Sequence, residues 1–153
     1  MRKFYVIEEF KNMDISLPER QTKHSAGYDL ATCEDVIIKP GEIVLIKTGL
    51  KVQIPQDEVL LVFPRSSLGI KKGLTMANNV GVIDSDYFNN PNNEGHIMIP
   101  LRNFGKNDVF LEKNERVAQG IFIKYFKTID DNNDTGMLLM MACLKYGSEK
   151  TLI

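Results

Sequence analysis

The chain has 153 residues, of which 43% are apolar and 25% are charged, and its formal net charge is −1. These values predict one globular domain with a core of its own and argue against a disordered chain. A net charge so close to zero gives no sign of a basic surface for nucleic acid or an anionic membrane, so we expect neither as a partner.

Compartment and redox state follow from the N-terminus, the apolar runs and the cysteines. The first ten residues, MRKFYVIEEF, carry charges at both ends and no apolar core, so we expect no signal peptide. The longest apolar run, Met137–Leu144, is too short to cross a bilayer. Cys33 and Cys143 have no CxxC spacing and fit reduced thiols rather than a disulfide or zinc framework. We therefore expect a soluble, cytoplasmic protein.

Short segments rich in Val, Ile, Leu and Phe recur along the chain and alternate with turn formers such as KPGE and NFGKND. The predicted strands are KFYVI, DVIIKP, EIVLIKTGLKVQI, EVLLVFP, HIMIPLRNF, DVFLEK and RVAQGIFIKYF. Their spacing predicts an all-β sandwich or barrel of jelly-roll type, with at most a short helix around RSSLGIKKG. The polar run Ile129–Gly136 is expected to separate a body, residues 1–128, from a tail, residues 129–153.

The sequence PRSSLG, after the fourth predicted strand, combines a guanidinium group with small donors. Arg65 stands beside the hydroxyls of Ser66 and Ser67, and Gly69 follows. Small donors with exposed main-chain N–H groups bind phosphate oxygens, and arginine can bind an anion through two hydrogen bonds. Taken alone, the motif is a weak signal, and a serine-rich turn that caps a helix, with the arginine in a surface ion pair, would also explain it.

The sequence NNVGVIDSDY places two carboxylates, Asp84 and Asp86, two residues apart. Their side chains would share a face if the preceding strand continued through them. Such a pair can share a cation or a proton, or it can face water at the end of a hairpin. The neighbours favour a ligand site: Gly81 allows close approach of the backbone, Asn78 offers an amide, and Tyr87 offers a flat ring. Together these groups can hold a planar base over a sugar.

Taken together, AGYDL, PRSSLG, NNVGVIDSDY and RVAQGIF resemble, in order and spacing, the first four motifs of the trimeric dUTPases (deoxyuridine 5'-triphosphate nucleotidohydrolases). The resemblance covers roughly residues 20–126, and the longer segment YFNNPNNEGHIMI is similar to that of a bacterial and phage subgroup. It implies a jelly-roll-like β fold, a homotrimer with active sites shared between subunits, and Mg²⁺-dependent hydrolysis of dUTP to dUMP and pyrophosphate. That reaction limits uracil incorporation into DNA and supplies dUMP for thymidylate synthesis.

The resemblance also implies roles for the residues around the two carboxylates. Asp84 would orient and deprotonate the water that attacks the α-phosphorus, and Asp86 would support the hairpin. The ring of Tyr87 would pack on the deoxyribose and leave no room for a 2'-hydroxyl. The remaining residues of this part of the site would read or flank the uracil ring: Asn78, Gly81, Val82, Ile83 and Met98.

A second group of residues would bind the phosphate chain, and it comprises Arg65, Ser66, Ser67, Gly69 and Gln119. By resemblance, Asp29 would lie near the hydration shell of the magnesium ion. Mg²⁺ keeps several waters and is carried largely by phosphate oxygens, so no direct protein ligand to the metal is expected.

The fifth motif of the family, a mobile arm with an arginine, several glycines and a phenylalanine, is not recognisable here, and KYGS at Lys145–Ser148 is only faintly similar. Closure of an arm excludes water and completes a catalytic site, so its loss leaves open a non-catalytic nucleotide-binding or regulatory protein on the same scaffold. A dCTP deaminase is a further alternative, although it would need a glutamate where this hairpin carries aspartates. His24 and His96 are expected to be surface or loop residues, not metal ligands.

Overall fold

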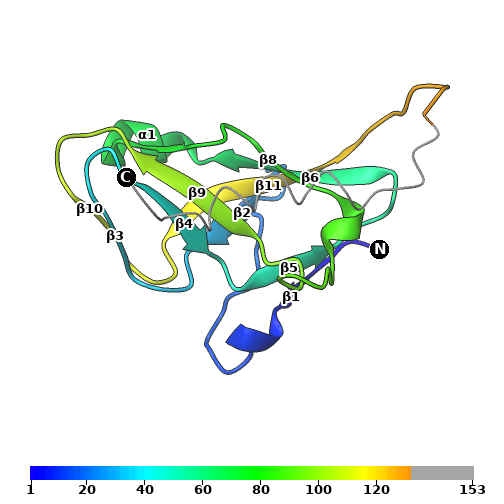
Figure 1. Ribbon diagram of the computed structural model, residues 1–153, viewed down its shortest axis with the longest axis horizontal. Coiled ribbons are helices and arrows are strands. Elements are labelled where there is room, and N and C mark those ends of the chain that lie inside the picture. The colour runs from blue at the N-terminus through cyan, green and yellow to red at the C-terminus, as the bar shows by residue number, and fades with distance from the viewer. Residues whose placement is uncertain (132–153) are drawn as a thin grey trace, which may run out of the picture.

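The computed structural model describes residues 1–131. Most of the expected tail, with Cys143 and Met137–Leu144, lies outside the described residues. Residues 1–131 are mostly β with one short helix, which confirms the expected fold class (Figure 1). The strands are β1 (Lys3–Val6), β2 (Tyr28–Ala31), β3 (Val36–Ile38), β4 (Ile43–Lys47), β5 (Leu50–Gln53), β6 (Glu58–Pro64), β7 (Leu74–Met76), β8 (Gly81–Ile83), β9 (Met98–Asn103), β10 (Val109–Leu111) and β11 (Arg116–Lys124). The helix is α1 (Ser66–Lys72), and 3₁₀ turns lie at Glu8–Phe10 and Ser85–Tyr87.

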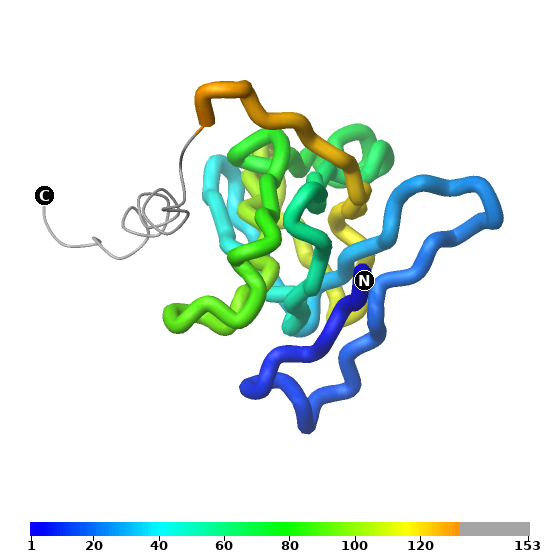
Figure 2. The backbone as a smooth tube through the Cα atoms, turned by 90° about the vertical axis from the view of Figure 1, so that its right-hand side faces the viewer, coloured from blue at the N-terminus to red at the C-terminus, as the bar shows by residue number. Residues whose placement is uncertain are grey.

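The strands of the described part pair antiparallel in four sheets, β1-β5, β3-β10, β4-β9-β7 and β2-β11-β6-β8. None of the neighbours in the four-stranded sheet is consecutive along the chain. The sheet therefore brings together segments that are far apart in the sequence, and the residues of the candidate site lie on these segments. A long loop, residues 11–27, projects from this body (Figure 2).

Fully buried residues from strands of different sheets form the hydrophobic core. Leu30 of β2 and Leu60 of β6 come from the four-stranded sheet, Ile46 of β4 and Leu101 of β9 from the three-stranded sheet, and Leu111 from β10. Successive side chains of a strand point to opposite faces, so Leu60 and Val62 of β6 both point into the core. Each buried side chain of this size contributes about 1.5–3 kcal/mol of transfer free energy.

One predicted strand, EIVLIKTGLKVQI, is two strands in the structure. The chain turns at Thr48 and Gly49, so that β4 pairs with β9 while β5 pairs with β1. Gly49 has a φ of +71°, a conformation that glycine adopts without strain. The apolar pattern runs through the turn, and for this reason the sequence did not reveal it. The strands β2 and β7 were not among the predicted strands; each has only three or four residues, and neither lies in a longer run of Val, Ile, Leu and Phe.

The expectation of a surface or loop position is wrong in part for His96. The residue lies in the loop before β9 but is only 6% exposed, and its ring packs on Phe10 with centroids 5.4 Å apart. Its Nε2 accepts a hydrogen bond from the main-chain N–H of Gly49 at 3.0 Å. Burial lowers the pKa of His96 below its ordinary value, which keeps the ring neutral and able to accept this bond. His24 is exposed in a turn, as expected.

Cys33 is a buried free thiol. Burial raises the pKa of this thiol, with the charge of Glu34 adding to the effect, so the group stays protonated and unreactive at neutral pH. No helix within residues 1–131 is both long enough and apolar enough to cross a membrane.

Candidate active site

The first half of the candidate site is a cluster around Asp29, at one end of the four-stranded sheet. The strand register pairs Gln119 of β11 with Asp29 of β2 on one side and with Phe63 of β6 on the other. Arg65, just after β6, approaches the Asp29 carboxylate with Nε 3.4 Å from Oδ1, and Arg116 donates to Oδ2 from Nη1 at 3.1 Å. Two guanidinium groups thus share one carboxylate whose side chain is 12% exposed.

Gly27 makes room for Gln119 in this cluster. A Cβ at position 27 would lie 2.6 Å from Oε1 of Gln119, which is far inside van der Waals contact. The glutamine donates from Nε2 to the carbonyl of Pro64 at 3.5 Å, which directs its side chain toward the end of β6. The glycine of AGYDL therefore allows the glutamine of RVAQ to take this conformation, and a larger residue there would displace the end of its side chain.

Ser66 and Ser67 open α1, directly beside this cluster. The helix begins after Arg65, and the residue at that position provides no side-chain cap. Neither serine hydroxyl makes a hydrogen bond to any group within residues 1–131, so helix capping does not explain the two serines. Gly69 lies inside the helix, which ends at Gly73 with a φ of +65°. The N–H of Leu68 in the first turn donates to the carbonyl of Arg65 at 3.0 Å, so the hydroxyls and main-chain N–H groups of Ser66 and Ser67 are the free donors next to Arg65.

The second half of the site follows β8. This strand pairs with β6, with Gly81 opposite Val62 and Ile83 opposite Leu60. A Cβ on Gly81 would lie 3.2 Å from the Val62 side chain and 3.9 Å from Nδ2 of Asn78, so the amide lies close to this glycine. Asn78 and Val82 are both exposed, so they are free to meet a ligand.

Asp84 and Asp86 do not share a strand face, because the strand does not continue through them. The strand ends at Ile83, and Ser85–Tyr87 forms a 3₁₀ turn that begins after Asp84. The turn leaves Asp84 half-buried and Asp86 exposed. Neither carboxylate makes a hydrogen bond or an ion pair in the described part of the chain, so the structure offers no bond through which Asp86 would hold the hairpin. Burial and, to a lesser extent, the charge of Asp86 raise the pKa of Asp84 above its ordinary value.

Tyr87 ends this turn with its hydroxyl tied into the protein. It donates to the main-chain oxygen of His96 at 3.0 Å and accepts from Nδ2 of Asn93 at 2.7 Å. Burial raises the pKa of the phenol. The bond to His96 holds the ring beside the start of β9, where the half-buried Met98 lies two residues further on. The structure thus places Tyr87 and Met98 in the same region as Asp84.

Asp84 and the Asp29 cluster lie at opposite ends of β6. Ile83 is opposite Leu60, so Asp84 lies level with the start of β6, whereas Arg65 directly follows its end. Six residues of extended chain separate these levels, which corresponds to about 20 Å at roughly 3.3 Å per residue. The structure does not bring Asp84 and the Asp29 cluster together within one chain.

Two residues of the site region were not assigned from the sequence. Arg116 belongs to the RVAQ motif, but a bulge in the β2–β11 pairing next to Val117 directs it at Asp29, and no pattern in the sequence indicates the bulge. Asn93 lies in the segment that follows Tyr87. The unusual length of that segment was the feature of the sequence that could have pointed to Asn93. Within residues 1–131 no three His, Cys, Asp or Glu side chains gather as a metal site.

Comparison with known proteins gives the same assignment over most of the chain. A family model described as dUTPase matches residues 13–138. The deoxyuridine 5'-triphosphate nucleotidohydrolase of Lactococcus lactis is 50% identical over 133 residues, which covers 87% of this chain and 89% of that protein. The enzyme of the same name from Rickettsia massiliae is 38% identical over 144 residues and is covered to 93%, as is this chain.

The structural neighbours agree with the sequence relatives. The crystal structure of dUTPase from Streptococcus mutans has a TM-score of 0.78 and 47% sequence identity, and the match covers 82% of this chain and 97% of that one. A dUTPase from phage phi11 of S. aureus has a TM-score of 0.70 at 21% identity, which shows a shared fold. With a family model, relatives and a fold that all agree, this chain belongs to the dUTPase family.

Proposed function

We propose that this protein hydrolyses dUTP to dUMP and pyrophosphate, and so limits uracil incorporation into DNA and supplies dUMP for thymidylate synthesis. The observation that carries the proposal is the 50% identity, over most of both chains, to a protein named as a deoxyuridine 5'-triphosphate nucleotidohydrolase. Residues 1–128 form the catalytic body in this proposal, and residues 129–153 a separate tail.

Asp84 is the base in the proposed reaction. It orients a water molecule and takes a proton from it as the water attacks the α-phosphorus, and the pyrophosphate leaves. An aspartate in water is a weak base, with a pKa of about 3.9. Partial burial raises the pKa of Asp84, which makes the carboxylate a better proton acceptor. Having no ion pair or hydrogen bond in the described part of the chain, it is also free to accept that proton.

The triphosphate is bound by the other half of the site. The free hydroxyls of Ser66 and Ser67 donate to phosphate oxygens, as do the first-turn N–H groups of α1, while Gly69 keeps this surface clear of a side chain. Arg65 supplies positive charge, with Asp29 holding its guanidinium in place. Gln119 meets the phosphates or the metal-bound waters from β11.

The residues present fit a magnesium ion that arrives with the nucleotide. Mg²⁺ would neutralise charge on the triphosphate when it is bound. Asp29 is the carboxylate nearest to that charge, and because it already engages two guanidinium groups it would face the water shell of the ion rather than the ion itself.

We further propose that the protein works as a homotrimer in which each active site combines residues of neighbouring subunits. The base must reach the α-phosphorus while the other phosphates are bound, yet Asp84 and Arg65 lie about 20 Å apart along β6, at roughly 3.3 Å per residue. Halves from different subunits can meet where one chain cannot fold them together. Exposed apolar side chains such as Ile70 (89%), Val82 (53%) and Phe126 (95%) would be covered in such an assembly.

Selection of the substrate follows from shape and hydrogen bonding. Tyr87 packs on the deoxyribose and rejects a 2'-hydroxyl sterically, while Asn78 and the backbone of Val82 and Ile83 pair with the uracil edge, next to Gly81 and Met98.

The test is pyrophosphate release by the full-length chain with Mg²⁺, with dUTP, dCTP, dTTP and UTP compared. Release from dUTP alone is expected. Binding of a non-hydrolysable dUTP analogue without release from dUTP would instead support a non-catalytic nucleotide-binding protein, and ammonia release from dCTP would support a deaminase. Sedimentation of the same sample should give the mass of three chains, and a stable monomer that is fully active would contradict the shared site.

A further inference from the structure

The hydroxyl of Tyr87 is fully used inside the protein. It donates its one proton to the carbonyl of His96 at 3.0 Å and accepts a hydrogen bond from Nδ2 of Asn93 at 2.7 Å. A phenol bonded from two sides cannot rotate away or tilt without breaking at least one of these bonds. What remains available to a ligand is the face of the ring.

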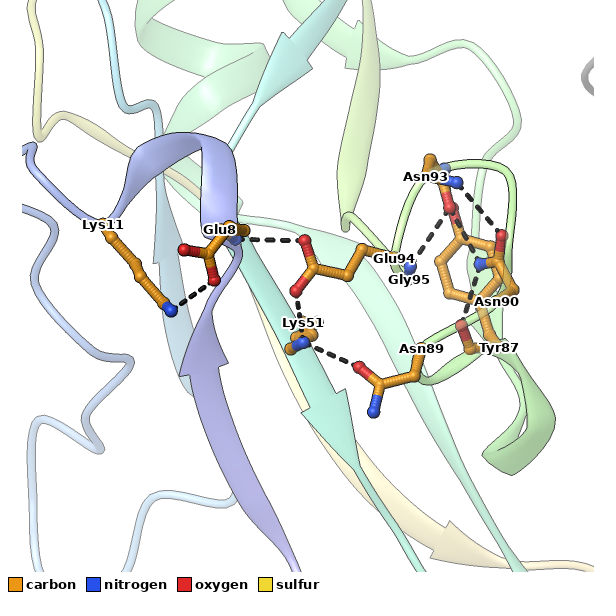
Figure 3. A network of polar contacts seen from close by, with 9 residues as sticks. All are labelled: Glu8, Lys11, Lys51, Tyr87, Asn89, Asn90, Asn93, Glu94 and Gly95. Atoms are coloured by element: carbon orange, nitrogen blue, oxygen red, sulfur yellow. Dashed lines mark hydrogen bonds and ion pairs between the residues drawn. The ribbon is translucent and has the colours of Figure 1, made fainter.

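The loop that carries Asn93 is held in one conformation by its own side chains. Asn90 donates from Nδ2 to the carbonyl of Tyr87 and to Oδ1 of Asn93, at 2.9 and 2.8 Å (Figure 3). Its Oδ1 accepts from the main-chain N–H groups of Asn92 and Asn93 at 3.0 and 3.2 Å. Oδ1 of Asn93 also accepts from the N–H of Gly95 at 3.1 Å. Gly95 has a φ of +85°, and a Cβ there would lie 2.6 Å from the carbonyl oxygen of Tyr87. The backbone of the loop at Gly95 therefore packs closely against the main-chain carbonyl of Tyr87.

The same loop is fastened to the body of the protein at its far end. The carboxylate of Glu94 accepts from the main-chain N–H of Glu8 at 3.0 Å and pairs with Lys51 of β5 (Figure 3). Lys51 also donates to Oδ1 of Asn89 at 2.6 Å. Asn93 therefore donates its hydrogen bond from a loop that is held in place at both ends. This bond restricts the motion of the Tyr87 ring.

We propose that Asn93 is a positioning residue for sugar selectivity: it holds the ring of Tyr87 in the place where that ring excludes a 2'-hydroxyl. This inference rests on the proposed function, in which Tyr87 packs on the deoxyribose. A steric filter works only if the wall cannot yield, and a hydroxyl adds little volume, so a small tilt of the ring is enough to admit ribose. In this protein the loop after the tyrosine supplies the bond that prevents the tilt.

The experiment compares kcat/KM for dUTP and for UTP in Tyr87→Phe, Asn93→Ala and the double variant, each as the full-length assembly. Tyr87→Phe keeps the ring and the hydrogen bonds that Asn90 and Asn93 make within the loop, but it removes the hydroxyl and with it the bonds to Asn93 and to the carbonyl of His96. Each single variant should lower the ratio of dUTP to UTP activity by about two- to tenfold, the range expected for one hydrogen bond. The double variant should match Tyr87→Phe, because loss of the hydroxyl already removes the bond that Asn93 donates to it.

Asn92→Ala is the matched control. Asn92 is the neighbouring asparagine of the same loop, its side chain is exposed, and that side chain makes no hydrogen bond within residues 1–131, so its ratio and its dUTP activity should equal those of the wild type. Thermal unfolding shows whether Asn93→Ala loses its fold, and in that case Tyr87→Phe alone decides.

An unchanged ratio in Tyr87→Phe, or a change in Asn93→Ala that adds to that of Tyr87→Phe, would overturn the inference. Failure of the wild type to release pyrophosphate from dUTP would instead count against the proposed function, so the two failures are distinguishable.

Discussion

Replacement of Asp84 by asparagine removes the proposed base while keeping the shape of the side chain. The amide fits the same half-buried position after β8, and no hydrogen bond or ion pair of residues 1–131 is lost with the carboxylate. Nothing in the described structure should therefore rearrange. The change isolates the proton-accepting role of the residue from any structural one.

The expected effect on rate is large and that on stability is small. A positioned general base contributes about 100- to 10,000-fold to a reaction, so kcat should fall within that range. Affinity for a non-hydrolysable dUTP analogue should stay close to that of the wild type, because no binding contact is removed. The assay is pyrophosphate release under saturating dUTP, with calorimetric titration of the analogue alongside it.

The raised pKa of Asp84 gives the stability a definite sign. A folded state that raises the pKa of an acid is stabilised less when the acid ionises, so the free energy of unfolding falls as the pH rises from about 3.9, the unfolded value, through the folded pKa. Asparagine does not ionise and lacks this penalty. At neutral pH, Asp84→Asn should unfold at the same temperature as the wild type or at a higher one.

Asp86→Asn is the control for this experiment. Asp86 is exposed, and its charge is the secondary cause of the raised pKa of Asp84. The variant should keep its hydrolysis, and the acid limb of its pH–rate profile should move to lower pH. Equal losses of rate in the two variants, or a loss of analogue binding as large as the loss of rate in Asp84→Asn, would refute the assignment of Asp84 as the base.

Three further results are expected. Arg2→Ala should lower the melting temperature, because the Glu58 carboxylate, 3% exposed, would lose its guanidinium partner; an unchanged transition would show that water replaces the arginine. Burial lowers the pKa of His96 in the folded state. The free energy of unfolding should therefore be highest above the unfolded pKa of about 6.5 and should decline as the pH falls from there through the lower pKa of the folded state. Chemical denaturation between pH 5 and pH 8 measures this, and His96→Gln, which cannot titrate, should flatten the curve. Gly27→Ala should displace the Gln119 side chain and raise the KM for dUTP; a KM equal to that of the wild type would mean that the glutamine does not meet the substrate.

The sequence alone carried the family assignment and most of the fold. Segments such as EVLLVFP and RVAQGIFIKYF are long enough to show their strand character, and they became β6 and β11. The four motifs lie in segments whose order along the chain is itself informative, and this order indicated the family that the comparisons show. The strands and the motifs could both be recognised in the sequence, because each depends on residue type and spacing within one segment.

The arrangement of the site was decided only by tertiary structure. The strand order β2-β11-β6-β8 brings Asp29 to Arg65 and separates both from Asp84, and nothing within any one segment specifies which strands become neighbours. The end of β8 at Ile83 buries one aspartate of the pair and exposes the other, which sets the pKa of Asp84. The contact of Asn93 with Tyr87 likewise depends on the packing of a loop. Distances between segments follow from packing in three dimensions, and pKa values follow from the burial that packing creates, so neither can be derived from local spacing.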